Sequence, residues 1–304
     1  MKSYATVDQM FYETCKSLRR LSDKIDSRDG SCSEQIGWVG RLRDLSSTVL
    51  NVPGRNFSHR YASAELLWYL SGTDRGELIS KFAPQYSRFL REDGTAEGAY
   101  GPRMFGQEMG VLRAIKELRE ASKSRRAVVP VFNSRDLLAA RHKSKDVPCT
   151  ISLQFLIRDG TLSMISTMRS NDVWLGMPYD VFCFTQIQRL VAERLFLKAG
   201  WYQHQVGSMH LYDRDAEKVD LIAPSHGPSV KTFSLPWYVT TDVAGRGDTD
   251  KVYFETMRGL ATSALEGTMS NDEKTLLEYC PQAFQRLCRI VLDEETELDA
   301  PIGD

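Results

Sequence analysis

The chain has almost no net charge with which to attract a partner. Its 304 residues include 39 Lys and Arg and 40 Asp and Glu, which gives a formal charge of −1 at pH 7. Neutralising many phosphates requires a surplus of basic side chains. The balance therefore argues against nucleic acid or an anionic membrane as a partner.

Long hydrophobic runs and cysteine patterns are also missing. No stretch of about 18 apolar residues occurs, and the N-terminal segment MKSYATVDQMFYETCK lacks the apolar core of a signal peptide. The six cysteines form no CxxC pair, and none has a histidine at zinc-ligand spacing. We therefore expect reduced thiols, no metal and a cytoplasmic protein.

The residues that are present predict a single α/β (α+β) domain, because apolar residues make up 42% of the chain and hairpin and helix patterns alternate. We expect residues 1–304 to form this domain, with helical extensions over 1–35 and 245–304, the latter containing two helical stretches. The expected helices cover residues 5–27, 63–72, 110–122 and 179–200. The expected strands cover residues 46–52, 126–132, 150–170 (two strands joined at Asp159-Gly160) and 201–212, and a loop is expected over 27–37.

Polar residues with chemical potential concentrate between residues 149 and 212. Cys149 follows a proline at the start of a strand, where it is either a nucleophile or, as most free cysteines are, a small buried apolar residue. Arg169-Ser170 offers a guanidinium and a hydroxyl to an anion, although the same segment also fits a solvated loop in which Asp180 caps a helix.

Two further groups have similarly ordinary alternatives. His210 and Tyr212 lie on one face of an expected strand, where both could reach one hydroxyl or simply form a half-buried polar pair. Arg125 and Arg126 end an expected helix, where such residues usually complement the helix dipole.

Taken together, these segments resemble the thymidylate synthase family in order and spacing, over about residues 43–215. Several separated matches in the correct order are far more specific than any one of them. The matching segments are Glu65-Leu66-Leu67-Trp68, Tyr100-Gly101, Ser124-Arg125-Arg126, Pro148-Cys149, Arg169-Ser170-x-Asp172, Leu175-Gly176-x-Pro178 and Gly207-x-x-His210-Leu211-Tyr212.

The resemblance implies a thymidylate synthase-like fold, with a mixed β-sheet, flanking helices and a homodimer packed sheet to sheet. It implies 5,10-methylenetetrahydrofolate as cosubstrate and a pyrimidine nucleoside monophosphate as substrate. The Cys149 thiolate would attack C6 of the pyrimidine and turn C5 into a nucleophile. Glu65 would order water and move protons, and Tyr100 and Asp180 complete the implied catalytic set.

The resemblance also implies binding roles. Arg169 and Ser170 would bind the phosphate, together with Arg125 and Arg126 from the partner subunit and one more arginine, for which Arg43 fits best and Arg41 and Arg55 stay possible. His210 and Tyr212 would bind the sugar. The folate would contact Asp172, Trp174, and Tyr86 and Phe89, which occupy the positions of two tryptophans in the family.

The departures from the family pattern predict the substrate. Thymidylate synthases have Asn where this chain has Asp180, and that Asn reads the uracil edge. Cytosine presents an N3 acceptor and a 4-amino donor, which a protonated carboxyl group matches, as does a carboxylate if N3 carries the proton. Thr150 replaces the His that follows the catalytic Cys. The segments 168–173 and 206–210 are also more similar to phage deoxycytidylate hydroxymethylases of the same superfamily.

We therefore expect 5-hydroxymethylation of a cytidine monophosphate, in bacterial cytoplasm or, for a phage protein, in the host cytoplasm. Retention of Ser170 and of both Arg125 and Arg126 favours dCMP slightly over CMP. One alternative is a methyltransferase that makes dTMP or 5-methyl-dCMP. A second is a non-catalytic relative that binds nucleotide or RNA.

Overall fold

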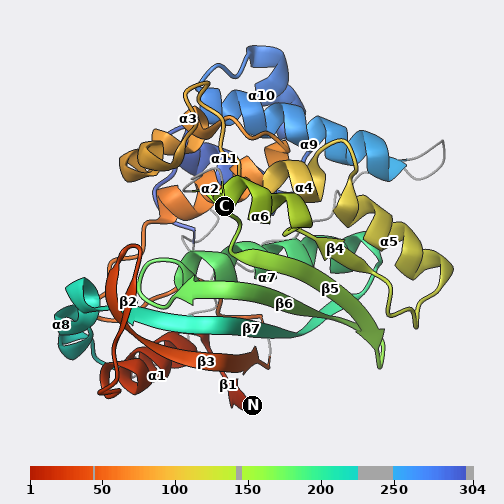
Figure 1. The fold of residues 1–304 in the computed structure, drawn as a ribbon. Helices are drawn as coiled ribbons and strands as arrows, with labels where there is room; N and C mark the ends of the chain where they lie inside the picture. Colours follow the sequence, from red (N-terminus) through yellow and green to blue (C-terminus); the bar gives the residue numbers. More distant parts are fainter. Residues whose placement is uncertain (44, 142–145, 225–248, 299–304) are drawn as a thin grey trace.

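A computed structural model describes the chain except for residues 44, 142–145, 225–248 and 299–304. Within the described residues, the centre is a seven-stranded mixed sheet of order β1-β3-β7-β6-β5-β4, with β2 paired to β3 (Figure 1). The strands are β1 (Lys2–Tyr4), β2 (Ile25–Ser27), β3 (Gly30–Leu42), β4 (Val128–Pro130), β5 (Thr150–Arg158), β6 (Thr161–Asp172) and β7 (Lys198–Tyr212).

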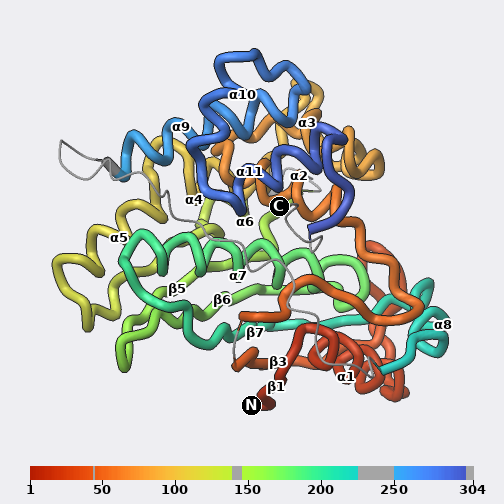
Figure 2. The backbone as a smooth tube through the Cα atoms, turned by 180° about the vertical axis from the view of Figure 1, so that it is seen from behind, coloured from red at the N-terminus to blue at the C-terminus, as the bar shows by residue number. Residues whose placement is uncertain are grey.

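Helices cover one face of the sheet and gather above one of its edges. Figure 2, which views the sheet from behind, shows α7 in front of the strands, where it packs on β6 and β7, while α1 covers β3 and a second group of helices stands above β5. The helices are α1 (Val7–Arg19), α2 (His59–Ser71), α3 (Gly76–Ser80), the 3₁₀ turn η1 (Pro84–Phe89), α4 (Gly101–Phe105), α5 (Gly110–Glu120), α6 (Ser134–Arg141), α7 (Met177–Arg194), α8 (Asp213–Leu221), α9 (Thr249–Glu266), α10 (Asn271–Leu277) and α11 (Gln282–Val291).

The central helix α7 makes β6 and β7 parallel, because a parallel pair needs a crossover connection and α7 supplies it. Most of its side chains are buried, and these include the polar residues Asp180, Gln186 and Gln188. β5 and β6 form a hairpin through Asp159 and Gly160, whose φ angles of 51° and 70° match the tight turn that the sequence predicts.

The predicted mixed α/β fold with flanking helices is confirmed, and so are several of its elements. The helices predicted at 63–72 and 110–122 are α2 and α5, and α2 ends at Gly72 with φ of 66°. The strand predicted at 201–212 is β7, which begins three residues earlier, at Lys198.

Other element predictions are wrong. The segment 27–37 is a turn only at residues 28–29, because Ser27 ends β2 and the residues from Gly30 form β3, which pairs with β2 and, from Cys32, with β7. The segment 46–52 forms none of the sheet's strands. The helix expected to reach Gly200 ends at Arg194, because Lys198 already pairs with β6.

The two ends of the chain also differ from expectation. The N-terminal segment 1–35 is not purely helical, since α1 ends at Arg19 and β1, β2 and part of β3 join the sheet. The described part of 245–304 contains three helices instead of two. α10 begins at Asn271, and its N-cap Ser270 forms a reciprocal capping box with Glu273 that supports a separate helix start.

This topology brings the predicted site residues to one end of the sheet. β5 starts directly after Cys149, and the antiparallel strand β6 ends there at Asp172. Because β7 runs parallel to β6, His210 lies opposite Asp172. α7 begins just beyond the end of β6 and places Asp180 in its first turn.

Candidate active site

Glu65 lies on α2 among hydrogen-bond donors. The Tyr61 hydroxyl donates to Glu65 Oε1 at 2.8 Å, and Cys183 Sγ lies 3.7 Å from Glu65 Oε2. Burial raises the pKa of Glu65 to about 7, against hydrogen bonds from Tyr61, Cys183 and Tyr69 that favour the carboxylate. Glu65 can therefore hold or release a proton near neutral pH.

Asp180 is a second buried carboxyl group, only 9% exposed. Asn171 Nδ2 donates to Asp180 Oδ2 at 2.7 Å. Burial first, and the negative charge of Glu65 second, raise the pKa of Asp180 to about 8, while the bond from Asn171 opposes the rise. The alternative in which Asp180 caps a helix is wrong, because Gly176 is the N-cap and Asp180 lies within α7.

Cys149 is half-buried at the start of β5, and Arg169 holds its loop in place. Arg169 Nε donates to the carbonyl of Pro148 at 2.9 Å, and Arg169 Nη2 to that of Val147 at 3.0 Å. Burial raises the pKa of the Cys149 thiol, and the positive charge of Arg169 lowers it. Arg169 therefore acts in the expected direction, but burial outweighs it.

Tyr100 and Tyr86 lie near the thiol and Glu65, and Phe89 packs beside Tyr86. The backbone N–H of Thr150 donates to the Tyr100 hydroxyl at 3.1 Å, which places Tyr100 beside Cys149. The Tyr86 hydroxyl lies 3.5 Å from both carboxylate oxygens of Asp146. The rings of Tyr86 and Phe89 have centroids 5.8 Å apart, and both side chains are half-buried.

The predicted sugar and phosphate residues of β6 and β7 lie side by side. Ser170 Oγ is 3.5 Å from His210 Nδ1, and the rings of His210 and Tyr212 meet edge to face at 5.0 Å between centroids. The structure thus brings together one hydroxyl, one imidazole and one phenol at the same end of the sheet.

Asp172 and Trp174, both predicted to bind folate, have different surroundings. Asp172 Oδ1 accepts the backbone N–H groups of Trp174 at 2.8 Å and Leu175 at 3.1 Å, and burial raises the pKa of Asp172. Trp174 is only 5% exposed, and its ring packs against Phe11 at 5.7 Å. This packing speaks against a direct contact between Trp174 and a ligand.

The three candidates for the additional phosphate-binding arginine have different surroundings. Arg43 is exposed directly after β3. The Arg41 guanidinium lies 4.0 Å from the centre of the Trp201 ring, and Arg55 Nη2 donates to the carbonyl of Trp174 at 3.0 Å. Arg41 and Arg55 are thus already engaged within the fold.

Arg125 and Arg126 lie away from the rest of the site in the same chain. They connect α5 to β4, and the Gln154 side chain donates to the Arg125 carbonyl at 3.0 Å. Gln154 is four residues along β5 from Thr150, which corresponds to roughly 13 Å. Figure 1 shows this connection at the opposite end of β5 from the site.

Sequence reasoning missed four side chains that support the site. Tyr61 precedes Glu65 by one helical turn, so helical spacing alone would have found that contact. Asn171, Cys183 and His204 were not assigned roles, because their contacts depend on the packing of α2 on α7 and on the register of β6 against β7.

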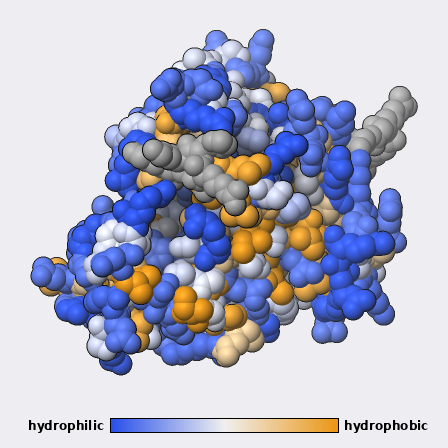
Figure 3. Space-filling model, viewed as in Figure 1, coloured by the Kyte–Doolittle hydropathy of each residue, from blue (hydrophilic) through white to orange (hydrophobic). Residues whose placement is uncertain are grey.

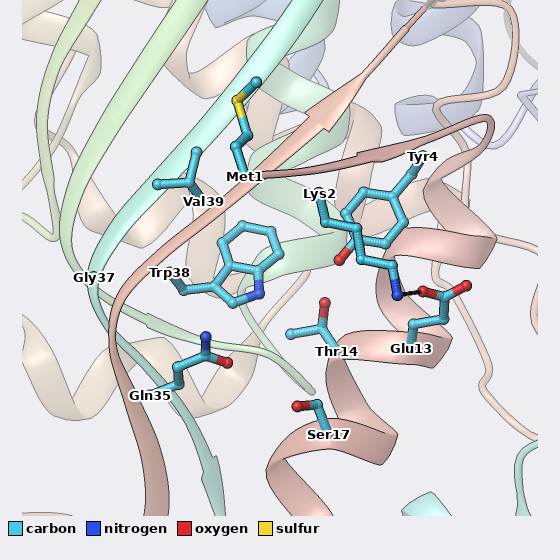
Figure 4. Close-up of a pocket in the computed structure, with 10 residues that line it drawn as sticks. All are labelled: Met1, Lys2, Tyr4, Glu13, Thr14, Ser17, Gln35, Gly37, Trp38 and Val39. Atoms are coloured by element: carbon cyan, nitrogen blue, oxygen red, sulfur yellow. Dashed lines mark ion pairs between the residues drawn. The ribbon is translucent and has the colours of Figure 1, made fainter.

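A separate surface hollow of about 350 Å³ lies between α1, β1 and β3 (Figure 4). Lys2 and Glu13 form an ion pair at its wall, and Trp38 lines it. None of the predicted site residues lines this hollow. We therefore place the candidate site at the sheet end that carries Cys149.

The described residues offer neither a metal-binding cluster nor a membrane-spanning helix. Among them, no three His, Cys, Asp or Glu side chains are grouped closely enough to hold a metal ion. No helix in the described part of the chain is long and apolar enough to cross a membrane.

Comparison with known proteins agrees with this geometry. Residues 9–232 match the family model of thymidylate synthase. The thymidylate synthase of Bacillus licheniformis is 28% identical over 213 residues, which cover 66% of this chain and 75% of the relative. The thymidylate synthase of Bacillus phage phi3T is 28% identical over 205 residues, which cover 64% and 72%.

A solved structure shows the same fold. Thermostable thymidylate synthase A from Bacillus subtilis superposes with a TM-score of 0.60 and 22% identity, covering 70% of this chain and 82% of its own. The family model extends over most of the chain and includes the segments that carry Glu65, Cys149, Asp180 and His210. The chain therefore belongs to the thymidylate synthase family, whose members use 5,10-methylenetetrahydrofolate for one-carbon transfer to a pyrimidine nucleotide.

Proposed function

We propose that the protein is a folate-dependent 5-hydroxymethylase of cytidine monophosphates, with dCMP preferred over CMP. The observation that carries this proposal is the buried carboxyl group of Asp180, which one amide, Asn171, holds from one side. Reading uracil requires a donor for O4 and an acceptor for N3–H. Reading cytosine requires an acceptor for the 4-amino group and a donor for N3.

The protonation of Asp180 supports the choice of cytosine. Because its pKa is raised to about 8, most molecules carry the proton at pH 7. A protonated carboxyl group both donates and accepts, which matches the cytosine edge. When the Asp180 proton lies on the carboxyl oxygen nearest N3, the N3–H of uracil faces another hydrogen-bond donor. This mismatch disfavours dUMP.

Cys149 and Glu65 carry the covalent and proton-transfer roles in this proposal. The thiol needs help to ionise because burial raises its pKa, and Arg169 is the cation that favours the thiolate. Glu65, with a pKa of about 7, can protonate the pyrimidine and later activate water. Tyr100, hydrogen-bonded at Thr150, helps to fix the start of β5 on which Cys149 lies.

The surroundings of the site fit a folate cosubstrate, which supplies the one-carbon unit. Tyr86 and Phe89 offer half-buried ring faces against which a pterin can pack, and Asp172 offers a carboxyl group to its ring nitrogens. Tyr86 also brings a hydroxyl close to Asp146. This polar pair favours retention of water near Cys149, which a hydroxymethyl product requires.

The proposed phosphate site is completed by a second subunit. Arg125 and Arg126 lie too far from Cys149 in the same chain to share one phosphate with Arg169. Figure 3 shows apolar surface over the sheet on the face without helices, and Ile36, Val128 and Ile151 of this sheet are 71%, 42% and 37% exposed. A homodimer packed through this face would cover that surface and exchange the arginines.

The test is a comparison of dCMP, CMP and dUMP, each tritiated at C5, with methylenetetrahydrofolate. We expect tritium release from dCMP above that from CMP, and little release from dUMP. Hydroxymethylation leaves tetrahydrofolate, so no dihydrofolate absorbance should appear. Release from dUMP alone would contradict the proposed substrate, and dihydrofolate formation would contradict the proposed product.

The second candidate is methyl transfer of the thymidylate synthase type, giving dTMP or 5-methyl-dCMP. It is favoured by the names of the relatives from Bacillus licheniformis and phage phi3T, which are both thymidylate synthases. The same assay separates the two, because methyl transfer oxidises the folate. A non-catalytic binding protein would instead keep its biological activity in a Cys149→Ala variant.

A further inference from the structure

A chain of buried polar side chains runs from Asp180 into the sheet. Asn171 Nδ2 donates to Asp180 Oδ2 at 2.7 Å, and Asn171 Oδ1 lies 3.0 Å from His204 Nε2. On the far side of the imidazole, His204 Nδ1 lies 2.7 Å from the Tyr202 hydroxyl and 2.9 Å from Ser166 Oγ. Ser166 on β6 lies opposite His204 on β7 in the sheet register. All five side chains are buried.

The position of each proton in this chain follows from the inventory of donors and acceptors. Burial lowers the pKa of His204 to about 3, so the ring is neutral and carries one N–H. Asn171 Oδ1 can only accept, so that N–H is on Nε2. His204 Nδ1 then accepts from the hydroxyl of Tyr202 or Ser166.

The amide of Asn171 is thereby held in one orientation. Its NH₂ group faces Asp180, so Asp180 Oδ2 is an acceptor, and the proton of a neutral Asp180 belongs on Oδ1. Oδ2 has a second lone pair, with which it can also accept from a 4-amino group. The carboxyl group therefore has one accepting oxygen and one donating oxygen, in a fixed order.

We propose that His204 is a positioning residue for base selection, which acts through Asn171 to fix the donor and acceptor oxygens of Asp180. This inference rests on the proposed function, because it assigns to Asp180 the reading of the cytosine edge. His204 touches neither Cys149 nor Glu65 through any hydrogen bond that the described residues show, so its influence is on base choice and not on the covalent step.

The opposite orientation of the amide explains why His204 matters. Without a donor at position 204, Asn171 can turn its oxygen toward Asp180, and the Asp180 proton then moves to Oδ2 to make that hydrogen bond. Oδ1 becomes a pure acceptor, which suits the N3–H of uracil. Loss of the imidazole is therefore expected to weaken the preference for cytosine.

The titration of Asp180 also depends on the other groups that surround it. Glu65 on α2 is the charged group whose effect on the pKa of Asp180 is largest. The remaining titratable groups that interact with Asp180 come from α2, α7, β7 and the segments just before α4 and β5, and they are Tyr69, Tyr100, Cys149, Cys183 and Tyr202. Substitution at His204 leaves all of these in place.

The experiment measures kcat/KM for tritium release from dCMP and from dUMP, between pH 6 and pH 9, with the full chain and methylenetetrahydrofolate. In His204→Phe, we expect the ratio of kcat/KM for dCMP to kcat/KM for dUMP to fall at least about tenfold, mainly because KM for dCMP rises. We also expect a shift in the part of the pH profile that is assigned to Asp180. His204→Gln restores an N–H toward Asn171 and should recover much of the ratio. Thr185→Val removes a buried hydroxyl of α7 that is not part of the hydrogen-bonded row from Asp180 to Tyr202, and it should leave the ratio unchanged.

A second variant keeps the test decisive if His204→Phe does not fold. Ser166→Ala combined with Tyr202→Phe leaves the imidazole but removes the hydroxyls that donate to its Nδ1, and it should lower the same ratio. If the parent prefers dCMP and every folded variant keeps both the ratio and the pH limb, the role of His204 is overturned while the proposed function stands. If the parent itself does not act on dCMP, the proposed function fails first.

Discussion

At the scale of single residues, Asp180 and Glu65 are two carboxyl groups that burial keeps from ionising at their usual pH. Each interacts with a different donor, Asn171 for Asp180 and Tyr61 for Glu65. Because the negative charge of one disfavours ionisation of the other, the pair favours a single negative charge near neutral pH. In the proposed function, Asp180 is the protonated group that reads the base and Glu65 is the group that transfers protons.

Replacing Asp180 should invert the choice of base. In Asp180→Asn, an amide presents a donor and an acceptor that match uracil, so we expect kcat/KM for dCMP to fall by about 10²-fold or more and turnover of dUMP to appear. Tritium release from both nucleotides measures this. Asp213→Asn makes the same chemical change at an exposed position of α8 and should alter neither rate. Equal turnover of dUMP by the parent and Asp180→Asn would contradict the assignment.

The raised pKa values also predict how stability depends on pH. Between the unfolded pKa of a carboxyl group, near 4, and the folded values of about 7 for Glu65 and about 8 for Asp180, the folded chain binds more protons. These two groups therefore stabilise the fold fully below pH 4 and lose that contribution as the pH rises through 8.

Calorimetry of the melting temperature between pH 5 and pH 8.5 tests this sign. Asp180→Asn removes one of the two titrations, so its melting temperature should decline less with pH than that of the parent. An equal decline in the parent and in Asp180→Asn would mean that Asp180 does not titrate between the folded and unfolded states in this range.

At the scale of elements, the close approach of β6 to the start of α7 requires a residue without a side chain at Gly176. A Cβ at this position would lie 2.9 Å from Asn171 Nδ2 and 3.3 Å from the carbonyl of Asp172. Gly176→Ala should therefore displace the amide that holds Asp180 and raise KM for dCMP about tenfold. Steady-state kinetics measures this effect.

A matched substitution separates that effect from helix propensity. A Cβ at Gly259, within α9, would meet nothing within 4 Å. Gly259→Ala should therefore raise the free energy of unfolding by about 0.5–1 kcal/mol and leave KM unchanged. If Gly176→Ala also left KM unchanged, Asn171 would not need this close approach.

The elements also show what the sequence can and cannot predict. The hairpin at Asp159-Gly160 and the end of α2 at Gly72 follow from local turn chemistry, and both were predicted. β3 was missed, because its Ser and Gly residues, and Asp29 just before it, are typical of a loop and only pairing with β2 and β7 makes it a strand. The motif residues of the site were identified from the chain alone, whereas the contact of Asn171 with His204 depends on strand register.

At the scale of the whole molecule, Arg125 and Arg126 lie far from Cys149 in the same chain, and we therefore propose that two subunits contribute to each site. A mixture of Cys149→Ala with the double variant Arg125→Glu/Arg126→Glu tests this. Each variant alone should be nearly inactive, but a hybrid dimer contains one site with both an intact thiol and intact arginines. Random mixing should restore about one quarter of the parental activity.

Subunit exchange needs its own control. The mixture should be assayed before and after mild denaturation and refolding together, and activity should rise only after exchange. High activity of Arg125→Glu/Arg126→Glu alone would show that the phosphate does not require these side chains.

The helices beyond residue 232, where the family match ends, hold α2 at both of its ends. The backbone N–H of Leu298 donates to His59 Nδ1 at 2.9 Å, and Arg258 Nε lies 3.5 Å from the carbonyl of Ser71. Asp250, 1% exposed, also pairs with Arg119 and Arg194. Proteolysis that removed the residues beyond 232 would therefore destabilise α2, the helix that carries Glu65. We expect the enzyme to lose turnover while much of the sheet stays folded.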